Sequence, residues 1–162
     1  MAQVHVQLIT EDDFLAWSKL YQGYAAFYNV PMNDEILTTV WSWIHDTSQT
    51  FYGLIAKDEQ GNALGIMHFR AMHSPLRGRM VGFLDDLFIA PDARGKPPAK
   101  GSNVVKALFD ELKIQGEAKG WPLMRWITAD NNYRARAVYD RLSTRTGWIT
   151  YQMDLLQNGN QS

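Results

Sequence analysis

Apolar residues recur along this chain with two different periods, and their order limits the folds it can adopt. Val4, Val6 and Leu8 alternate with polar residues, which predicts a half-buried strand. Between residues 34 and 46 the apolar residues recur at every third or fourth position, which predicts an amphipathic helix. Along the whole chain the patterns predict the order strand, two helices, three strands, helix, strand, helix, strand. That order is typical of an α/β fold with a mixed sheet.

Residues that start and stop secondary structure place the boundaries of these elements. Asn33 or Asp34 is expected to cap the second helix, and Gly120 to end the third. The predicted helices span residues 14–30, 34–46, 101–119 and 131–142, and the predicted strands span residues 4–8, 51–57, 63–73, 81–90, 123–128 and 148–155. The chain contains no linker or repeat, and 162 residues suit one full-sized core. We therefore predict a single domain over residues 1–156, followed by a polar tail at 157–162.

Composition excludes several classes of protein. The chain is 46% hydrophobic and 20% charged, as expected of a soluble globular protein, and its net charge of -1 gives no general attraction to nucleic acid or anionic membranes. The absence of cysteine excludes disulfides, thiolate metal sites and a cysteine nucleophile. No signal peptide is recognisable, and no apolar run approaches the roughly 20 residues that span a bilayer. We predict a cytoplasmic protein with neither a membrane nor a nucleic-acid partner.

Two adjacent carboxylates, Asp85 and Asp86, lie in the central predicted strand. Neighbouring residues of a strand point to opposite faces, so we expect at most one of them to line a given pocket. In one interpretation, one carboxylate faces solvent and the other is hydrogen-bonded near a strand bend. In the other, one carboxylate lies in a cleft, where it attracts an ammonium group or helps to remove its proton through water.

The predicted helix near the C-terminus carries a polar, a small and a phenolic residue on one face. Asn132, Ala135 and Tyr139 stand at positions i, i+3 and i+7. Such a face suits a long thin ligand whose reactive end lies under the Tyr139 hydroxyl. An ordinary amphipathic helix with a half-buried tyrosine is the alternative. Upstream, the central strand runs into the turn formed by Arg94, Gly95 and Lys96.

Together, this strand, turn and helix resemble the Gcn5-related N-acetyltransferase (GNAT) family. The resemblance implies a GNAT fold, with a central, mixed but mostly antiparallel sheet flanked by helices. It also implies acetyl transfer from acetyl-coenzyme A to a primary amine, without a metal. The long link from Tyr139 to Gly147 and Trp148, with Phe27 and Tyr28 at the end of the first helix, resembles the branch of yeast histone-type and D-amino-acid acetyltransferases.

The resemblance also implies roles for individual residues. Tyr139 would protonate the departing thiolate, and Asp85 and Asp86 would bind the amine or help to remove its proton. Tyr24, Phe27 and Tyr28 would line the acceptor cleft beside Asp85, although an aromatic stripe of this kind also suits a core. Coenzyme A would be held by Leu87, Phe88, Ile89, Arg94, Gly95, Lys96, Gly101, Ser102, Asn132, Ala135 and Tyr139.

The turn that would hold the pyrophosphate departs from the family pattern. Residues 97–100 form an apparent insertion, and Asn103 stands where a small residue is expected. Pro97 and Pro98 have no N–H to offer a phosphate, although Lys96 and Lys100 add positive charge. The leading prediction is an enzyme that acts on a small amine or amino acid by direct attack in a ternary complex. The alternatives are a non-catalytic binding module with impaired coenzyme A binding, and a nucleic-acid binder.

The histidines give no pattern of their own. His5, His45, His68 and His73 lie in unrelated elements without ligand spacing, so we predict no metal site and a structural or surface role for each. Arg70 and His73 are weak candidates for contact with the acceptor. A homodimer is compatible with these predictions.

Overall fold

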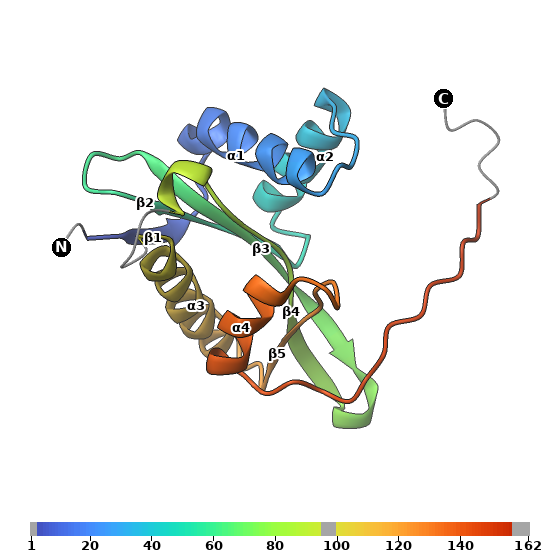
Figure 1. Ribbon diagram of the computed structural model, residues 1–162. Helices are drawn as coiled ribbons and strands as arrows, with labels where there is room; N and C mark the ends of the chain where they lie inside the picture. The colour runs from blue at the N-terminus through green and yellow to red at the C-terminus, as the bar shows by residue number, and fades with distance from the viewer. Residues whose placement is uncertain (1–2, 95–99, 157–162) are drawn as a thin grey trace. The chain divides into compact units, whose positions relative to one another are not determined.

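The computed structural model describes residues 3–94 and 100–156. It divides into two compact units, residues 1–127 and residues 128–162, which are described separately. The first unit contains a five-stranded sheet in the order β1-β2-β3-β4-β5, and the second contains α4 (Figure 1). The bounds of the elements are β1 (His5–Leu8), α1 (Phe14–Phe27), α2 (Asp34–His45), β2 (Phe51–Lys57), β3 (Ala63–Ser74), β4 (Arg79–Ile89), α3 (Lys100–Ala118), β5 (Met124–Trp126) and α4 (Tyr133–Leu142). The prediction of a single domain over residues 1–156 stays a prediction.

The sheet is mixed and mostly antiparallel, which confirms the predicted fold class. Strands β1 to β4 pair antiparallel in sequence order, and β5 pairs parallel with β4. A parallel pair needs a crossover connection, and α3 lies in that connection. The turn between β2 and β3 is closed by Asp58, whose carboxylate accepts hydrogen bonds from the backbone N–H groups of Gln60 and Asn62.

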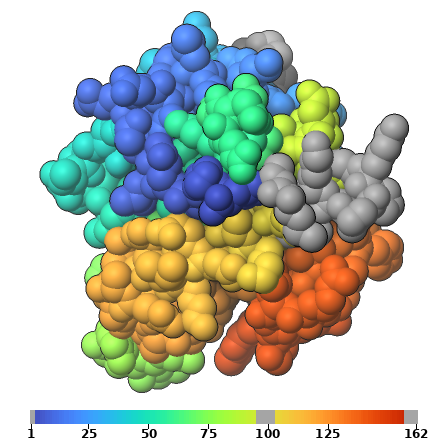
Figure 2. Space-filling view, turned by 90° about the vertical axis from the view of Figure 1, so that its left-hand side faces the viewer, coloured from blue at the N-terminus to red at the C-terminus, as the bar shows by residue number. Residues whose placement is uncertain are grey.

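Two apolar clusters occupy opposite faces of this sheet. Ile55 and Ile66 pack with α1 and α2, whereas Leu54 and Met67 pack with α3. Because β2 and β3 are covered on both faces, their sequences are continuous apolar runs rather than alternating ones. Figure 1 shows α1 and α2 on one side of the sheet and α3 on the other, and the space-filling view shows α3 in gold next to β1 in dark blue (Figure 2).

Two helix ends follow the predicted cap residues. The Asn33 side chain accepts a hydrogen bond from the backbone N–H of Ile36 at 2.8 Å, which caps α2. After α3, Gly120 has a φ of 72°, a left-handed conformation that glycine adopts without steric cost. The N–H of Trp121 then donates to the carbonyl of Gly116, so the turn satisfies a carbonyl at the end of the helix.

Strand β4 is only partly paired on the edge that faces β5. The two strands pair over residues 82–84. Among the described residues, no strand pairs with that edge of β4 over residues 85–89. Since each strand residue carries a backbone donor and an acceptor, this part of β4 offers hydrogen-bonding groups to a ligand.

The C-terminal unit begins as predicted, but the strand predicted at residues 148–155 is wrong. Asn132 is the N-cap of α4, and its side-chain oxygen accepts a hydrogen bond from the N–H of Ala135 at 3.3 Å. Residues 144–155 form no helix or strand. Their alternating pattern is real, but a strand needs a neighbour to pair with its backbone. Several large apolar side chains therefore remain exposed: Trp148, Ile149, Tyr151, Met153 and Leu155.

Candidate active site

A bulge in β4 brings both adjacent aspartates to one hollow. His68 pairs with Asp86 and Phe69 pairs with Leu84, so Asp85 is an extra residue in β4. A bulge places two residues opposite one and interrupts the alternation of side chains. Asp85 and Asp86 therefore both line one cavity of about 470 Å³. The expectation that at most one of them would line a given pocket was wrong.

The cavity lies between α1, α2 and the middle of the sheet. Its walls combine aromatic and aliphatic side chains with three charged groups, an arrangement typical of small-molecule sites. Tyr21, Trp43 and Phe51 are wall residues that no sequence motif indicated. The lining consists of Tyr21, Val40, Trp43, Gln49, Thr50, Phe51, Arg70, Ala71, Asp85 and Asp86.

Asp86 is held by a buried network of hydrogen bonds. Its Oδ2 lies 2.9 Å from His68 Nδ1 and accepts a hydrogen bond from the Tyr21 hydroxyl at 3.3 Å. The indole N–H of Trp17 donates to His68 Nε2 at 2.8 Å. Trp17 and His68 are fully buried, whereas 19% of the Asp86 side chain is exposed. The carboxylate thus forms the boundary between the core and the cavity.

The environment of Asp86 favours its ionised form. Burial raises the pKa of Asp86, but its interactions with His68 and with the Tyr24 and Tyr21 hydroxyls outweigh burial and leave the pKa below its usual value. Burial and the neighbouring Asp86 in turn raise the pKa of both tyrosines. The two phenols therefore stay protonated and act as donors, and Asp86 is a fixed anion at neutral pH.

Asp85 has the opposite tendency. Its two oxygens accept hydrogen bonds from Arg70 Nε at 3.0 and 3.2 Å, and the Arg70 guanidinium lies 4.7 Å from the centre of the Phe83 ring. Burial raises the pKa of Asp85 and outweighs the opposing effect of Arg70. Adjacent carboxyl groups with pKa values shifted in opposite directions suit different tasks. Asp85 is the better proton acceptor of the two.

The predicted aromatic residues of α1 are divided between two places. Tyr24 acts electrostatically on Asp86, and the Tyr24 ring lies edge-on to Phe88 at 6.0 Å. Phe27 and Tyr28 are exposed at the end of α1. Neither of these two lines the 470 Å³ cavity, and Phe27 lines a second hollow.

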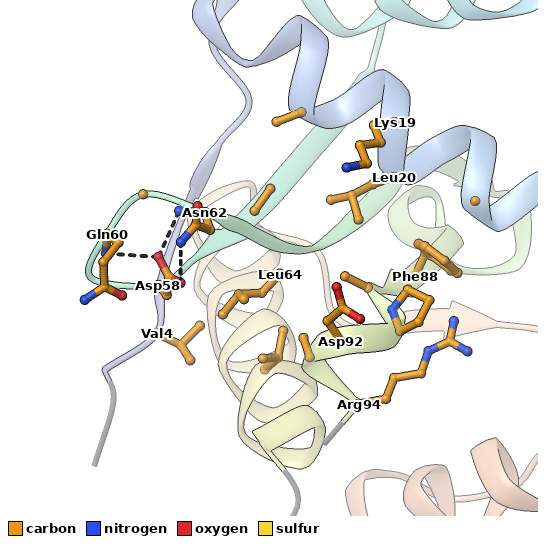
Figure 3. Close-up of a pocket in the computed structure, with 18 of the residues that line it drawn as sticks. Val4, Lys19, Leu20, Asp58, Gln60, Asn62, Leu64, Phe88, Asp92 and Arg94 are labelled. Carbon is orange, nitrogen blue, oxygen red and sulfur yellow. Dashed lines mark hydrogen bonds between the residues drawn. The ribbon is translucent and has the colours of Figure 1, made fainter. Parts of the chain in front are cut away.

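The second hollow measures about 1370 Å³ and lies between α1, the turn joining β2 and β3, and the turn after β4 (Figure 3). Phe88 and Arg94, two of the predicted coenzyme A residues, line it. Arg94 Nε donates to the carbonyl of Ile89 at 2.8 Å, and the guanidinium lies 4.9 Å from the Phe88 ring centre and 5.2 Å from that of Phe27. Lys19 adds a second cationic side chain to the lining.

The remaining coenzyme A positions are only partly described. Leu87 and Ile89 belong to the part of β4 that no described strand pairs on its second edge. Gly95 and Lys96 lie outside the described residues, as do residues 97–99 of the predicted insertion at 97–100. Gly101 and Ser102 form part of the first turn of α3, where backbone N–H groups are available to an anion.

In α4, Asn132 and Ala135 are joined by the capping hydrogen bond. Tyr139 lies one turn further along, and its carbonyl accepts hydrogen bonds from the backbone N–H and hydroxyl of Ser143. The three residues share one helix face, as predicted. Their roles toward coenzyme A stay predictions. Among the residues that the structure describes, no group of His, Cys, Asp and Glu could hold a metal ion.

Comparisons with known proteins agree with this architecture. Residues 17–143 match the model of the Acetyltransferase (GNAT) family. The D-amino-acid N-acetyltransferase of Saccharomyces cerevisiae is 26% identical over 151 residues, which are 93% of this chain and 90% of the yeast protein.

Solved structures share the fold at lower identity. A probable acetyltransferase has a TM-score of 0.81 at 20% identity, covering 95% of this chain and 99% of its own. The aminoglycoside N-acetyltransferase AAC(6')-Iy, in complex with a bisubstrate analogue, has a TM-score of 0.78 at 18% identity, with 95% and 99% covered. The ribosomal-protein-alanine N-acetyltransferase of Brucella melitensis has a TM-score of 0.73 at 22% identity, with 94% and 100% covered.

Proposed function

Because this chain belongs to the GNAT acetyltransferase family and is an acyl-coenzyme-A-dependent N-acetyltransferase, we propose that it acetylates the primary amine of a small molecule, with an amino acid as the favoured acceptor. Acetyl-coenzyme A is the donor in this proposal. The observation that carries the choice of acceptor is the pair of carboxylates, Asp85 and Asp86, in one cavity.

The cavity supports a small cationic acceptor. Asp86 is a fixed anion, which suits an ammonium group, and Trp43 and Phe51 provide apolar walls for the rest of the molecule. A volume of about 470 Å³ lies in the range of small-molecule sites. The yeast relative carries the name of a D-amino-acid N-acetyltransferase, which favours an amino acid over a protein tail.

We infer direct transfer within a ternary complex. Asp85 accepts a proton from the ammonium group, directly or through water, and the freed amine attacks the thioester carbonyl. Backbone N–H groups of β4 polarise that carbonyl. The new C–N bond forms as the C–S bond breaks, Tyr139 gives a proton to the thiolate, and the second proton of the attacking nitrogen passes through water to restore the Tyr139 phenol. The chain has no cysteine, so an acyl-cysteine intermediate cannot form.

An acceptor screen tests this proposal. Purified protein with acetyl-coenzyme A is offered D- and L-amino acids, polyamines, aminoglycosides and histone peptides, and released thiol is measured. We expect acceptor-dependent release with a small amine or amino acid, and each enantiomeric pair serves as its own matched control. Release with peptides alone, or with none of the acceptors, would contradict the proposal.

The alternative of a non-catalytic binding module depended on Pro97 and Pro98, which lie outside the described residues. No feature of the described residues favours it over catalysis. Thermal unfolding with acetyl-coenzyme A distinguishes the two, because a ligand at 100 times its Kd adds about 2.7 kcal/mol to native-state stability. We expect a clear rise in Tm, and no rise at millimolar ligand would support the alternative.

Cytoplasmic location, a homodimer and the absence of a nucleic-acid partner all stay predictions. Of the helices that the structure describes, none is long and apolar enough to cross a membrane.

A further inference from the structure

We propose that Trp17 and His68 are positioning residues for the acceptor amine: the indole of Trp17 fixes the proton of His68 on Nδ1, and that N–H fixes the Asp86 carboxylate where it binds the ammonium group. This inference rests on the proposed function. It assigns a task to a histidine that the sequence analysis placed among structural or surface residues.

The direction of each hydrogen bond follows from the chemistry of the groups. An indole N–H can only donate, so His68 Nε2, 2.8 Å from Trp17 Nε1, must accept. A neutral imidazole carries its single proton on the other nitrogen. His68 Nδ1 therefore donates to Asp86 Oδ2 across 2.9 Å. Trp17 selects the tautomer, and the tautomer makes His68 a donor to Asp86.

The packing around His68 holds the ring in this orientation. From α1, the Tyr21 ring lies edge-on to the imidazole at 4.8 Å, and from β2 the Phe51 ring lies at 5.6 Å. The charged and titratable groups that act on this network are Asp86 and Asp85 from β4, Arg70 from β3 through Asp85, and Tyr21 and Tyr24 from α1. His68 itself has no exposed surface.

The number of donors around Asp86 leaves room for a ligand. An ionised carboxylate offers about four acceptor positions. His68 and Tyr21 supply two donors from the protein. The carboxylate retains 19% exposure and lines the 470 Å³ cavity, so its remaining capacity is directed to the cavity. An ammonium group in the cavity can donate to an acceptor position of Asp86 that the protein leaves open.

Two substitutions at His68 distinguish the hydrogen bond that His68 donates to Asp86 from the one that it accepts from Trp17. In His68→Asn the amide can occupy the position of Nδ1 and donate to Asp86, but it cannot reach Trp17 as Nε2 does. In His68→Gln the amide can accept from Trp17, but no donor remains at the Nδ1 position. With an amine that the acceptor screen finds active, we expect KM for that amine to rise roughly tenfold or more in His68→Gln. In His68→Asn the KM for the amine should rise less.

Other kinetic readouts distinguish positioning from a general loss of structure. KM for acetyl-coenzyme A should stay at the wild-type value in both variants. In His68→Gln the acid limb of kcat/KM for the amine should move to higher pH, because burial then raises the pKa of Asp86 with one opposing donor fewer. His45→Gln is the matched control, since His45 packs on Trp41 and is not among the residues lining the cavity.

Ring ¹⁵N chemical shifts of His68 test the network without any acceptor and without a His68 variant. In the wild-type protein we expect a protonated Nδ1 and an unprotonated Nε2, and in Trp17→Phe a mixture of the two tautomers. The reverse tautomer in the wild type would overturn the inference, even if the His68 variants fail to fold. Unchanged amine KM and unchanged pH profile in folded His68→Gln would also overturn it. A wild type that acetylates no amine would instead overturn the proposed function, and the ammonium role of Asp86 with it.

Discussion

Two carboxylates that are neighbours in the sequence have different chemical properties in the structure. Interactions with His68, Tyr24 and Tyr21 lower the pKa of Asp86 despite its burial, whereas burial raises the pKa of Asp85 despite Arg70. An anion that stays charged is suited to binding, and a carboxylate with a raised pKa is suited to accepting a proton at neutral pH.

Neutral substitutions of equal size test this division of labour. Asp85→Asn is expected to lower kcat for amine acetylation by about 10²- to 10⁴-fold with little change in KM, because it removes the proton acceptor. Asp86→Asn is expected to raise KM for the amine by about tenfold or more, because it removes the charge that binds the ammonium group. Steady-state kinetics with the amine varied distinguish the two. Equal effects on kcat and KM in both variants would show that the roles are not divided.

At the scale of single elements, α4 offers a matched pair of tyrosines. Tyr139 shares its helix face with Asn132 and Ala135, whereas Tyr133 is 73% exposed at the start of the helix. Tyr139→Phe is expected to lower kcat by about 10²- to 10⁴-fold, because the thiolate loses its proton donor. The rise in Tm with coenzyme A should stay as in the wild type. Tyr133→Phe should leave both quantities unchanged, and wild-type turnover in Tyr139→Phe would remove the phenol from the mechanism.

A second element-scale prediction concerns the close approach of β3 to the end of β4. A Cβ added at Gly65 would lie 2.9 Å from the carbonyl oxygen of Phe88, whereas one added at Gly116 in α3 would meet atoms at ordinary distances of 3.6 Å or more. Gly65→Ala should therefore destabilise the protein by about 1–3 kcal/mol. Gly116→Ala should stabilise it by up to about 1 kcal/mol. Urea unfolding measures both changes in stability. An unchanged free energy of unfolding in Gly65→Ala would show that β4 can move away from the added methyl group.

The helices and strands differ in how well the sequence predicts them. Segments with a clear apolar period and a cap, such as α2 with Asn33, were predicted almost to the residue. The strand predicted at residues 148–155 was wrong, because a strand needs a neighbour to pair with and a local pattern cannot supply one. The shared cavity of Asp85 and Asp86 was missed because a bulge is a property of pairing register, visible only when β3 lies beside β4. The hydrogen bond between Trp17 and His68 could not be predicted because the two residues lie 51 positions apart in the chain.

For the molecule as a whole, pH acts on stability through buried carboxylates away from the cavity as well. Asp13 is buried and accepts hydrogen bonds from Lys57 Nζ at 2.5 Å and from the N–H of Thr10 at 2.8 Å. Burial raises the pKa of Asp13, but these bonds outweigh burial and lower it overall.

Asp13→Asn is expected to reduce the free energy of unfolding at pH 7 by about 1–3 kcal/mol. A lowered folded-state pKa contributes stability above the unfolded value of about 3.9, and that stability is lost as pH falls through the folded pKa. The free energies of unfolding of the wild type and Asp13→Asn should therefore converge as the pH falls below about 4. Urea titrations across this range measure the difference. A difference independent of pH would mean that the ionised carboxylate is not its source.

The extra residue in β4 changes which face of the sheet the even-numbered side chains occupy. Before it, even-numbered Leu84 belongs to the α3 cluster; after it, even-numbered Phe88 belongs to the α1–α2 cluster and odd-numbered Ile89 faces α3. Removing one residue here would reverse every later side chain of the strand, so Phe88 would be directed into a space filled for Ile89. The length of this strand therefore determines the cavity as much as the identity of its residues does: side chains at 85 and 86 can be exchanged while the segment keeps its register, whereas shortening the segment would rearrange the cavity wall.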